Sequence, residues 1–209
     1  MEEKVFGYKP SVMDGTEFVF GAPAEKPEIP SSYTYRPYLP MVINQGALSI
    51  CVPCSLSANL NWRVNLKDGE PKDNRIALMD IYGAKTNLGD GMSFKEALHY
   101  LRHEGVRSNV GPLKIGHYAR VISLPVLKYA IILNGPCVGA LPVYSLDCDF
   151  WNQKPGDKLM AYHAISIVGY DEDGLIIRNS WGTDFCDDGY AKLDYEDFSK
   201  LMEIWTIVD

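Results

Sequence analysis

Apolar residues recur at helical spacing in the first half of the chain. Val52, Leu56, Leu60 and Val64 follow one another every four residues, which places them on one face of a predicted helix that begins near Cys51. Further helices are predicted over residues 76–82, 93–105 and 123–134. The helix at 93–105 starts with a capping box, because Ser93 is followed three residues later by Glu96.

After Gly135 the pattern changes to short apolar runs separated by glycine and aspartate turns, which is typical of strands. Strands are predicted over residues 137–143, 163–169, 175–178, 190–193 and 204–208. Helices followed by strands indicate an α+β fold. Residues 1–40 differ from both halves, because they are rich in proline and aromatic residues and lack periodicity. We therefore expect an extended N-terminal strap that docks on the folded body.

Composition and charge narrow the classes of function that this chain can have. The 209 residues carry a formal net charge of −7, and no cluster of basic residues stands out, which argues against nucleic acid as a partner. No apolar run is long enough to span a membrane, and the first residues lack the pattern of a signal peptide. Five cysteines are an odd and sparse set, which favours a reducing compartment, with the cytoplasm slightly favoured. The oligomeric state stays open.

Cys51 stands at the predicted start of an amphipathic helix. Backbone N–H groups and the helix dipole at such a position favour the thiolate, which is the nucleophilic form of cysteine. A buried structural cysteine gives the same pattern, and taken alone it is the commoner case. Cys51 and Cys54 also form a C-x-x-C pair, as in thioredoxin-like redox sites, but the preceding residues are turn-like rather than a strand. The other three cysteines lack the spacing of a zinc site.

Two further polar residues stand at strand ends. His163 opens an apolar strand, and an imidazole there can exchange a proton with a thiol near neutral pH. Asn179 follows another strand, and its side-chain oxygen can orient an imidazole, with Trp181 shielding that bond. A satisfied strand-end histidine, a turn asparagine and a core tryptophan are the alternatives when each residue is taken singly.

Taken together, the sequence motifs around these residues resemble those of the papain-like cysteine peptidases. The resemblance runs through Asn44-Gln45-Gly46 and Cys51, then His163-Ala164 with Ile167-Val168-Gly169-Tyr170, and then Asn179-Ser180-Trp181-Gly182 and Gly189-Tyr190. Cysteine, histidine and asparagine occur in that order in this family, with the last two somewhat over a hundred residues downstream. The match extends from about residue 35 to residue 208.

The resemblance implies a role for each matching residue. Cys51 would be the nucleophile, His163 the base and then the acid, and Asn179 the residue that orients His163. Gln45 would donate its side-chain amide to the oxyanion, beside the backbone N–H of Cys51. No metal or organic cofactor is implied.

A second set of residues is implied to bind the substrate. Asp90-Gly91-Met92 looks like the family's glycine segment, which pairs with an extended peptide, and a side chain at Gly91 would block that approach. Met92 and Ala164 would line a pocket for an apolar side chain, and Trp181 would border the site. The expected partner is a peptide or protein substrate.

The implied fold has two lobes with the active site between them. A helical lobe at about residues 45–110 would pack against an antiparallel, barrel-like lobe at about 111–209, and together they form the domain 41–209 that the strap crosses. Val52 replaces an aromatic residue that is usual in the family, and Leu48 replaces a frequent disulfide cysteine. The strap is interpreted as part of the mature fold rather than as a long propeptide. The missing aromatic at Val52 and the bulky Ile50 beside Cys51 keep open a catalytically weak or inactive member that only binds peptides or partners.

Overall fold

The computed structural model describes residues 6–68, 76–83 and 91–209. The sequence also predicts that Gly69 and Pro71 end the first helix; these two residues, and Asp90 of the implied substrate segment, lie outside the described residues. The side chains of residues 66–68 are likewise not described.

All four predicted helices are present. Their bounds are α1 Cys51–Asp68, α2 Leu78–Gly83, α3 Phe94–His103 and α4 Leu124–Asn134, with short 3-10 turns η1 Arg36–Tyr38 and η2 Tyr195–Lys200. The capping box of α3 is formed, because the Ser93 hydroxyl accepts from the Glu96 N–H while the Glu96 carboxylate accepts from the Ser93 N–H. Helix α4 has Pro125 in its first turn, where the missing N–H costs no hydrogen bond.

Helix α1 is the central helix of the molecule. The predicted apolar face of Val52, Leu56, Leu60 and Val64 is fully buried. Its serines and asparagines are also buried, and several bond to backbone: the Asn59 side-chain amide donates to the carbonyl of Pro136. The Ser166 hydroxyl of the sheet donates to the carbonyl of Ser55, which fixes α1 against the sheet. Because α1 is covered on most sides, its position is rigidly determined.

The main sheet is antiparallel and has the strand order β4-β9-β5-β6-β7-β8, with β1 paired to β6. Its strands are β1 Tyr33–Thr34, β4 His117–Arg120, β5 Cys137–Val143, β6 Ala161–Tyr170, β7 Gly174–Arg178, β8 Tyr190–Asp194 and β9 Ile204–Val208. A separate hairpin joins β2 Val106–Ser108 to β3 Gly111–Leu113. The α+β prediction is confirmed, but the barrel-like description is wrong: among the described strands nothing joins β4 to β8, so the sheet is open.

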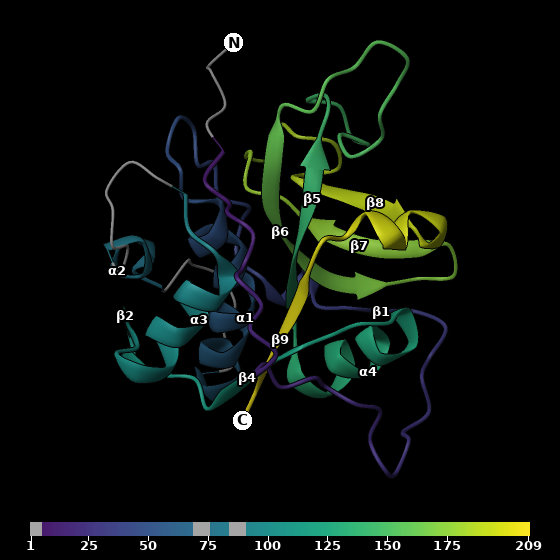
Figure 1. Cartoon of the computed structure of the whole chain (residues 1–209). Helices are drawn as coiled ribbons and strands as arrows, with labels where there is room; N and C mark the ends of the chain where they lie inside the picture. Colours follow the sequence, from purple (N-terminus) through teal and green to yellow (C-terminus); the bar gives the residue numbers. More distant parts are fainter. Residues whose placement is uncertain (1–5, 69–75, 84–90) are drawn as a thin grey trace.

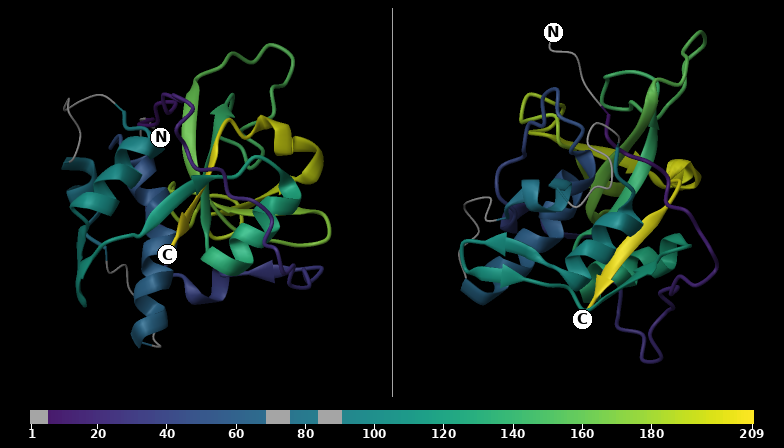
Figure 2. Two further views of the ribbon diagram at one scale, coloured as in Figure 1. Left: turned by 60° about the horizontal axis from the view of Figure 1, so that its bottom comes forward. Right: turned by 60° about the vertical axis from the view of Figure 1, so that its left-hand side comes forward.

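The helices and the sheet occupy different sides of the molecule. Figures 1 and 2 show α1, α2 and α3 together on one side and strands β5–β8 on the other, with α4 against the sheet. Buried apolar residues form two clusters: one within the sheet and α4, and one centred on α1 and α3 that reaches into β5, β6 and β9. The exact division into lobes at residue 110 stays a prediction.

Residues 6–40 run across both parts of the molecule. Phe18 and Phe20 exchange backbone hydrogen bonds with Arg120 of β4. Further along, β1 adds to the edge of β6, where a Cβ on Gly169 would lie 2.3 Å from the carbonyl oxygen of Tyr33, so only glycine allows this approach. The Tyr35 hydroxyl then donates to the carbonyl of Ile131 in α4. The strap is therefore held both by backbone pairing and by side-chain hydrogen bonds.

One disulfide links Cys148, in the loop after β5, to Cys186, in the loop between β7 and β8. Cys51, Cys54 and Cys137 are free and buried. The disulfide differs from the expectation of reduced thiols. Sequence spacing did not show it, because the two loops meet only when β5 and β7 enter the same sheet.

A search of the described residues finds no helix with the length and apolar character needed to cross a lipid bilayer.

Candidate active site

Cys51 is the first residue of α1 and is completely buried. Backbone N–H groups of Ala164 in β6, of Gly7 in the strap, and of Val52 and Cys51 at the start of α1 act on its thiol and lower the thiol pKa. The sulfur therefore lies between the helix start, the strap and the residue that follows His163.

His163 is also completely buried. Its Nε2 atom lies 2.7 Å from Oδ1 of Asn179, within hydrogen-bond distance. Its ring stacks on Trp181 with centroids 4.9 Å apart, and Phe150 meets it edge-on at 6.0 Å. Sequence reasoning predicted both the asparagine partner and the tryptophan cover, and the structure brings these three side chains together.

Asn179 lies directly after β7 and is fixed on several sides. Its N–H donates to the carbonyl of Gly189, and its Oδ1 also accepts from the Ser180 N–H. An oxygen that accepts from two neighbours is held in one orientation. Asn179 therefore presents a fixed acceptor to His163.

Gln45 is buried beside the start of α1 and is tied to the loop after β7. Its Oε1 accepts from the Ser180 hydroxyl at 2.6 Å, and its Nε2 donates to the carbonyl of Leu48 at 2.9 Å. Its backbone N–H donates to the carbonyl of Ser180. These bonds fix the side-chain amide between the loop after β7 and the loop that precedes α1.

The strap enters the site, which the sequence did not predict. The Met92 N–H donates to the carbonyl of Gly7 at 2.7 Å, and the Lys9 N–H donates to the carbonyl of Met92 at 3.0 Å. Tyr8 thereby pairs with Met92 in a parallel bridge. Phe6 reaches His163, with ring centroids 5.8 Å apart. Residues 6–9 therefore cover both Cys51 and His163.

Gly91 permits this pairing. A Cβ on Gly91 would lie 2.6 Å from the carbonyl oxygen of Gly7, and a Cβ on Gly7 would lie 2.1 Å from the carbonyl oxygen of Ser49. Contacts this short do not occur, so both positions need glycine. A side chain at Gly91 would therefore clash with the extended backbone of the strap, while the pairing of Gly91 with a substrate stays a prediction. Met92 and Ala164, the expected pocket residues, belong to one buried cluster with Tyr8.

The strap also changes the electrostatics of the thiol. Burial raises the pKa of Cys51 above its ordinary value, although the surrounding N–H groups act in the opposite direction. The sequence predicted a lowered pKa from the helix start alone, and in the described arrangement desolvation outweighs it. Cys54 is buried too, and desolvation, followed by the nearby Cys51, raises the pKa of its thiol to about 12.

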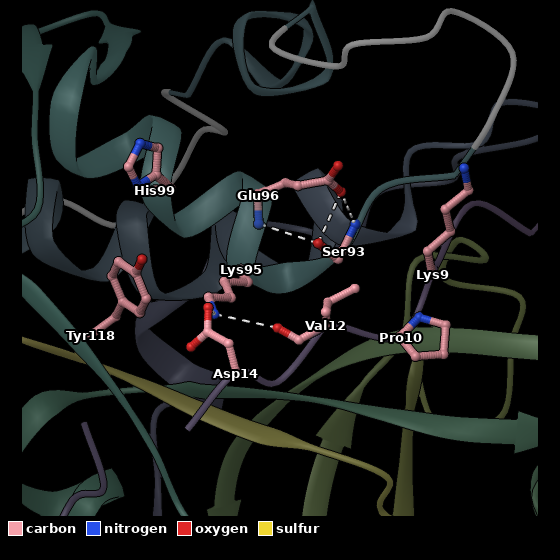
Figure 3. A pocket seen from close by; sticks show the side chains of 9 residues that line it. All are labelled: Lys9, Pro10, Val12, Asp14, Ser93, Lys95, Glu96, His99 and Tyr118. Atoms are coloured by element: carbon pink, nitrogen blue, oxygen red, sulfur yellow. Dashed lines mark hydrogen bonds and ion pairs between the residues drawn. The ribbon is translucent and has the colours of Figure 1, made fainter. Parts of the chain in front are cut away.

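A hollow of about 460 Å³ lies elsewhere, between the strap and α3 (Figure 3). Lys95 crosses it and bonds to the carbonyl of Val12 and to the carboxylates of Asp14 and Glu17. The hollow therefore marks an anchor of the strap rather than the site of Cys51 and His163.

Comparison with known proteins agrees with this geometry. A family model described as papain family cysteine protease matches residues 90–204. Cathepsin B-like CP2 of Giardia intestinalis is 26% identical over 219 residues, which covers 83% of this chain and 71% of that protein. Cathepsin B-like CP3 of the same organism is 36% identical over 83 residues, which covers 34% of this chain and 27% of that protein.

Solved structures extend the likeness to the whole fold. Xylellain, a cysteine protease from Xylella fastidiosa, superposes with a TM-score of 0.81 at 21% identity, covering 97% of this chain and 95% of that one. ProCathepsin B S9 from Trypanosoma congolense gives a TM-score of 0.77 at 15% identity, covering 98% and 87%. Since the family model matches more than half of the sequence, this chain belongs to the papain family of cysteine proteases.

Proposed function

We propose that this chain hydrolyses peptide bonds, with Cys51 as the nucleophile and His163 as its proton partner. The bond of 2.7 Å between His163 Nε2 and Asn179 Oδ1 carries this proposal, because it lies in the buried site that also holds the Cys51 thiol. An amide oxygen only accepts, so Nε2 carries the hydrogen of that bond. Nδ1 is then the ring nitrogen that exchanges a proton with the thiol.

The reaction follows from these positions. The Cys51 thiolate attacks the peptide carbonyl, and His163 gives the proton to the leaving amine, which leaves an acyl group on sulfur. Water, deprotonated by His163, then releases the acid. Trp181 keeps solvent from the bond between His163 and Asn179. The backbone N–H of Cys51 and the side-chain amide of Gln45 are the proposed oxyanion donors, and loss of one such donor costs about 10²–10³ in rate.

A substrate is proposed to use the path that the strap now occupies. Met92 offers its N–H and its carbonyl to an extended chain, and in the described arrangement these groups bond to the carbonyl of Gly7 and to the N–H of Lys9, while Gly91 leaves room for the approach. Ala164 and Met92 border the neighbouring side-chain position. Because the strap fills this path, a substrate has to displace residues 6–9 before it reaches Cys51. Turnover is therefore proposed to depend on an opening step.

The cellular location stays a prediction. The sparse cysteines favoured a cytoplasmic protein, whereas the disulfide between Cys148 and Cys186 favours an oxidising compartment. Rapid alkylation of the protein in its native cells, followed by counting the modified thiols by mass, decides between them. Five alkylated cysteines indicate a reducing compartment and three indicate an oxidising one.

The proposal is tested by hydrolysis of a panel of fluorogenic peptides at several pH values. Cys51→Ala is expected to abolish turnover, whereas the matched variant Cys54→Ala, one helical turn away, is expected to retain it. Equal activity of Cys51→Ala and the unchanged chain would contradict the proposal. Saturable peptide binding by fresh protein without any hydrolysis would instead identify a peptide-binding member of the family.

A further inference from the structure

Cys51 and Cys54 form a C-x-x-C pair in the first turn of α1. Cys51 is the first residue of the helix, and the Cys54 N–H donates to the carbonyl of Ile50 at 2.9 Å, which closes that turn. Cα atoms three residues apart in a helix lie about 5 Å from each other, within the range of about 4.4–6.8 Å that disulfides span. The backbone therefore holds the two thiols at a spacing that a disulfide can bridge.

The start of a helix is the place where such a bond can close. Cβ atoms three residues apart in a regular helix are separated by about 5–6 Å, whereas a disulfide needs about 3.5–4.5 Å. The N–H groups of a first turn have no acceptor within the helix, so Cys51 can rotate slightly without losing a donated helical bond. Pro53, between the two cysteines, has no N–H to lose. Closure therefore needs only a local adjustment at Cys51.

Cys54 lies beside a buried cation as well as beside Cys51. The guanidinium of Arg178 is buried and donates to three neutral oxygens, the carbonyls of Pro40 and Met41 and the hydroxyl of Tyr190. Burial, followed by the charge of Cys51, raises the pKa of the Cys54 thiol, and the charge of Arg178 acts in the opposite direction. Cys54 thus interacts with both the nucleophile and a positive charge that favours a thiolate.

We propose that Cys54 is the resolving cysteine of a reversible oxidation site, in which a hydroperoxide oxidises Cys51 and Cys54 converts the product into a disulfide. The inference rests on the proposed function only in taking Cys51 as the nucleophilic thiol. It gives a role to a buried thiol that peptide hydrolysis does not use.

The reaction has two steps. The Cys51 thiolate attacks one oxygen of the hydroperoxide, the O–O bond breaks, and the departing oxygen takes a proton from water. Cys51 is then a sulfenic acid, and its sulfur has given two electrons to the peroxide. The Cys54 sulfur attacks the Cys51 sulfur, the S–O bond breaks, and the departing hydroxide takes the Cys54 thiol proton and leaves as water. A dithiol returns the two electrons and restores both thiols.

The disulfide protects the nucleophile from permanent loss. Without a neighbouring thiol, further peroxide converts a sulfenic acid into sulfinic and sulfonic acids, which a dithiol does not reduce. With Cys54 one turn away, the sulfenic acid is consumed before that oxidation. Peptide hydrolysis is therefore switched off by peroxide and restored by a reductant.

The test follows the full chain through oxidation and recovery. The protein is treated with excess hydrogen peroxide until Cys51 no longer reacts with a thiol reagent, is freed of peroxide, and is then given dithiothreitol. Before reduction, tandem mass spectrometry is expected to find a bond between Cys51 and Cys54 and a mass lower by two hydrogen atoms. After reduction, peptide hydrolysis and labelling of Cys51 should return to the level of unoxidised protein given the same reductant.

Variants at the second thiol sharpen the result. Cys54→Ala removes the resolving sulfur, and Cys54→Ser puts a hydroxyl in its place. After the same treatment, each is expected to recover less than about a tenth of the hydrolysis that the unchanged chain recovers, with two or three oxygen atoms added to Cys51. Cys137→Ala, at another free and buried cysteine, is the matched control and should recover like the unchanged chain.

The outcomes separate the two proposals. Absence of a bond between Cys51 and Cys54 in an oxidised, previously active chain would overturn the role of Cys54 and leave the peptidase proposal intact. Full recovery of the Cys54 variants would do the same. A chain that forms the bond but hydrolyses no peptide would overturn the peptidase proposal alone, and a chain that does neither would overturn both. If neither variant folds, the bond mapped in the unchanged chain decides.

Discussion

Gly91 faces the strap so closely that a Cβ on it would lie 2.6 Å from the carbonyl oxygen of Gly7. The pairing of this segment with residues 7–9 uses backbone groups, which are the same in every peptide. Part of the chain itself therefore lies in extended form along this segment.

Replacement of Gly91 by alanine is expected to displace the strap without unfolding the body, because the clashing atoms belong to Gly7 and Lys9. Labelling of Cys51 by a small alkylating reagent should become at least about tenfold faster. Peptide hydrolysis should fall, since the same methyl group blocks an extended substrate. Gly21→Ala, at a glycine whose surroundings are open, is the control and should change neither rate. Slower alkylation of Gly91→Ala than of the unchanged chain would contradict this account.

The pH dependence of labelling should differ between the closed and displaced forms. Burial raises the pKa of Cys51 while the strap covers it, so the thiolate of the closed form appears only at a pH above the ordinary thiol range. In Gly91→Ala the burial is relieved and the N–H groups at the start of α1 remain. The midpoint of the labelling rate against pH should therefore lie lower in the variant. Coincident midpoints would show that the strap does not control the thiol.

Asn179→Ala should lower kcat by at least about tenfold with a smaller effect on KM, because it removes the acceptor that orients His163 without touching the peptide path. Asn179→Asp keeps an oxygen at the same place and is expected to retain more activity than the alanine variant. The control is Asn109→Ala, at an exposed position of the β2–β3 turn. A kcat that Asn179→Ala leaves unchanged would rule out the orienting role.

The disulfide should contribute measurably to stability. Cys148 and Cys186 are 38 residues apart, and closure of a loop of that size stabilises a fold by about 2–4 kcal/mol. The double variant Cys148→Ser with Cys186→Ser should lower the free energy of unfolding in urea by that amount. A reducing agent should destabilise the unchanged chain similarly and leave the variant unaffected. Equal stability with and without reductant would show that the two thiols are not linked.

Local sequence patterns predicted the helices and strands whose apolar residues recur with a regular period on one buried face. Helices α3 and α4 and strands β5 and β9 were identified because their caps and apolar periods are strong. Strands β2, β3 and β4 were missed, since three or four residues give too little alternation to recognise. The sheet was also expected to close like a barrel, but closure depends on which strands meet at the edges, and no local pattern encodes that.

The sequence predicted those residues of the site that lie in recognisable motifs. Cys51, His163 and Asn179 lie in recognisable sequence motifs. The hydrogen bond between His163 and Asn179 is present in the structure. The position of the strap over Cys51 and His163 was not predictable, because Gly7 binds through backbone groups that leave no sequence signature. The hydrogen bond between Tyr8 and the buried Glu203 was not predictable either, because these residues lie almost two hundred positions apart and only the folded chain brings them together.

The most direct test of the peptidase proposal locates the reactive sulfur. The full chain is treated with a peptidyl epoxide and mapped by mass spectrometry, in parallel with His163→Ala and with His99→Ala as an exposed histidine control. The account predicts one adduct, on Cys51, that forms at least about a hundredfold more slowly in His163→Ala and at the normal rate in His99→Ala. An adduct on Cys54 or Cys137, or equal labelling of Cys51 in His163→Ala, would contradict it.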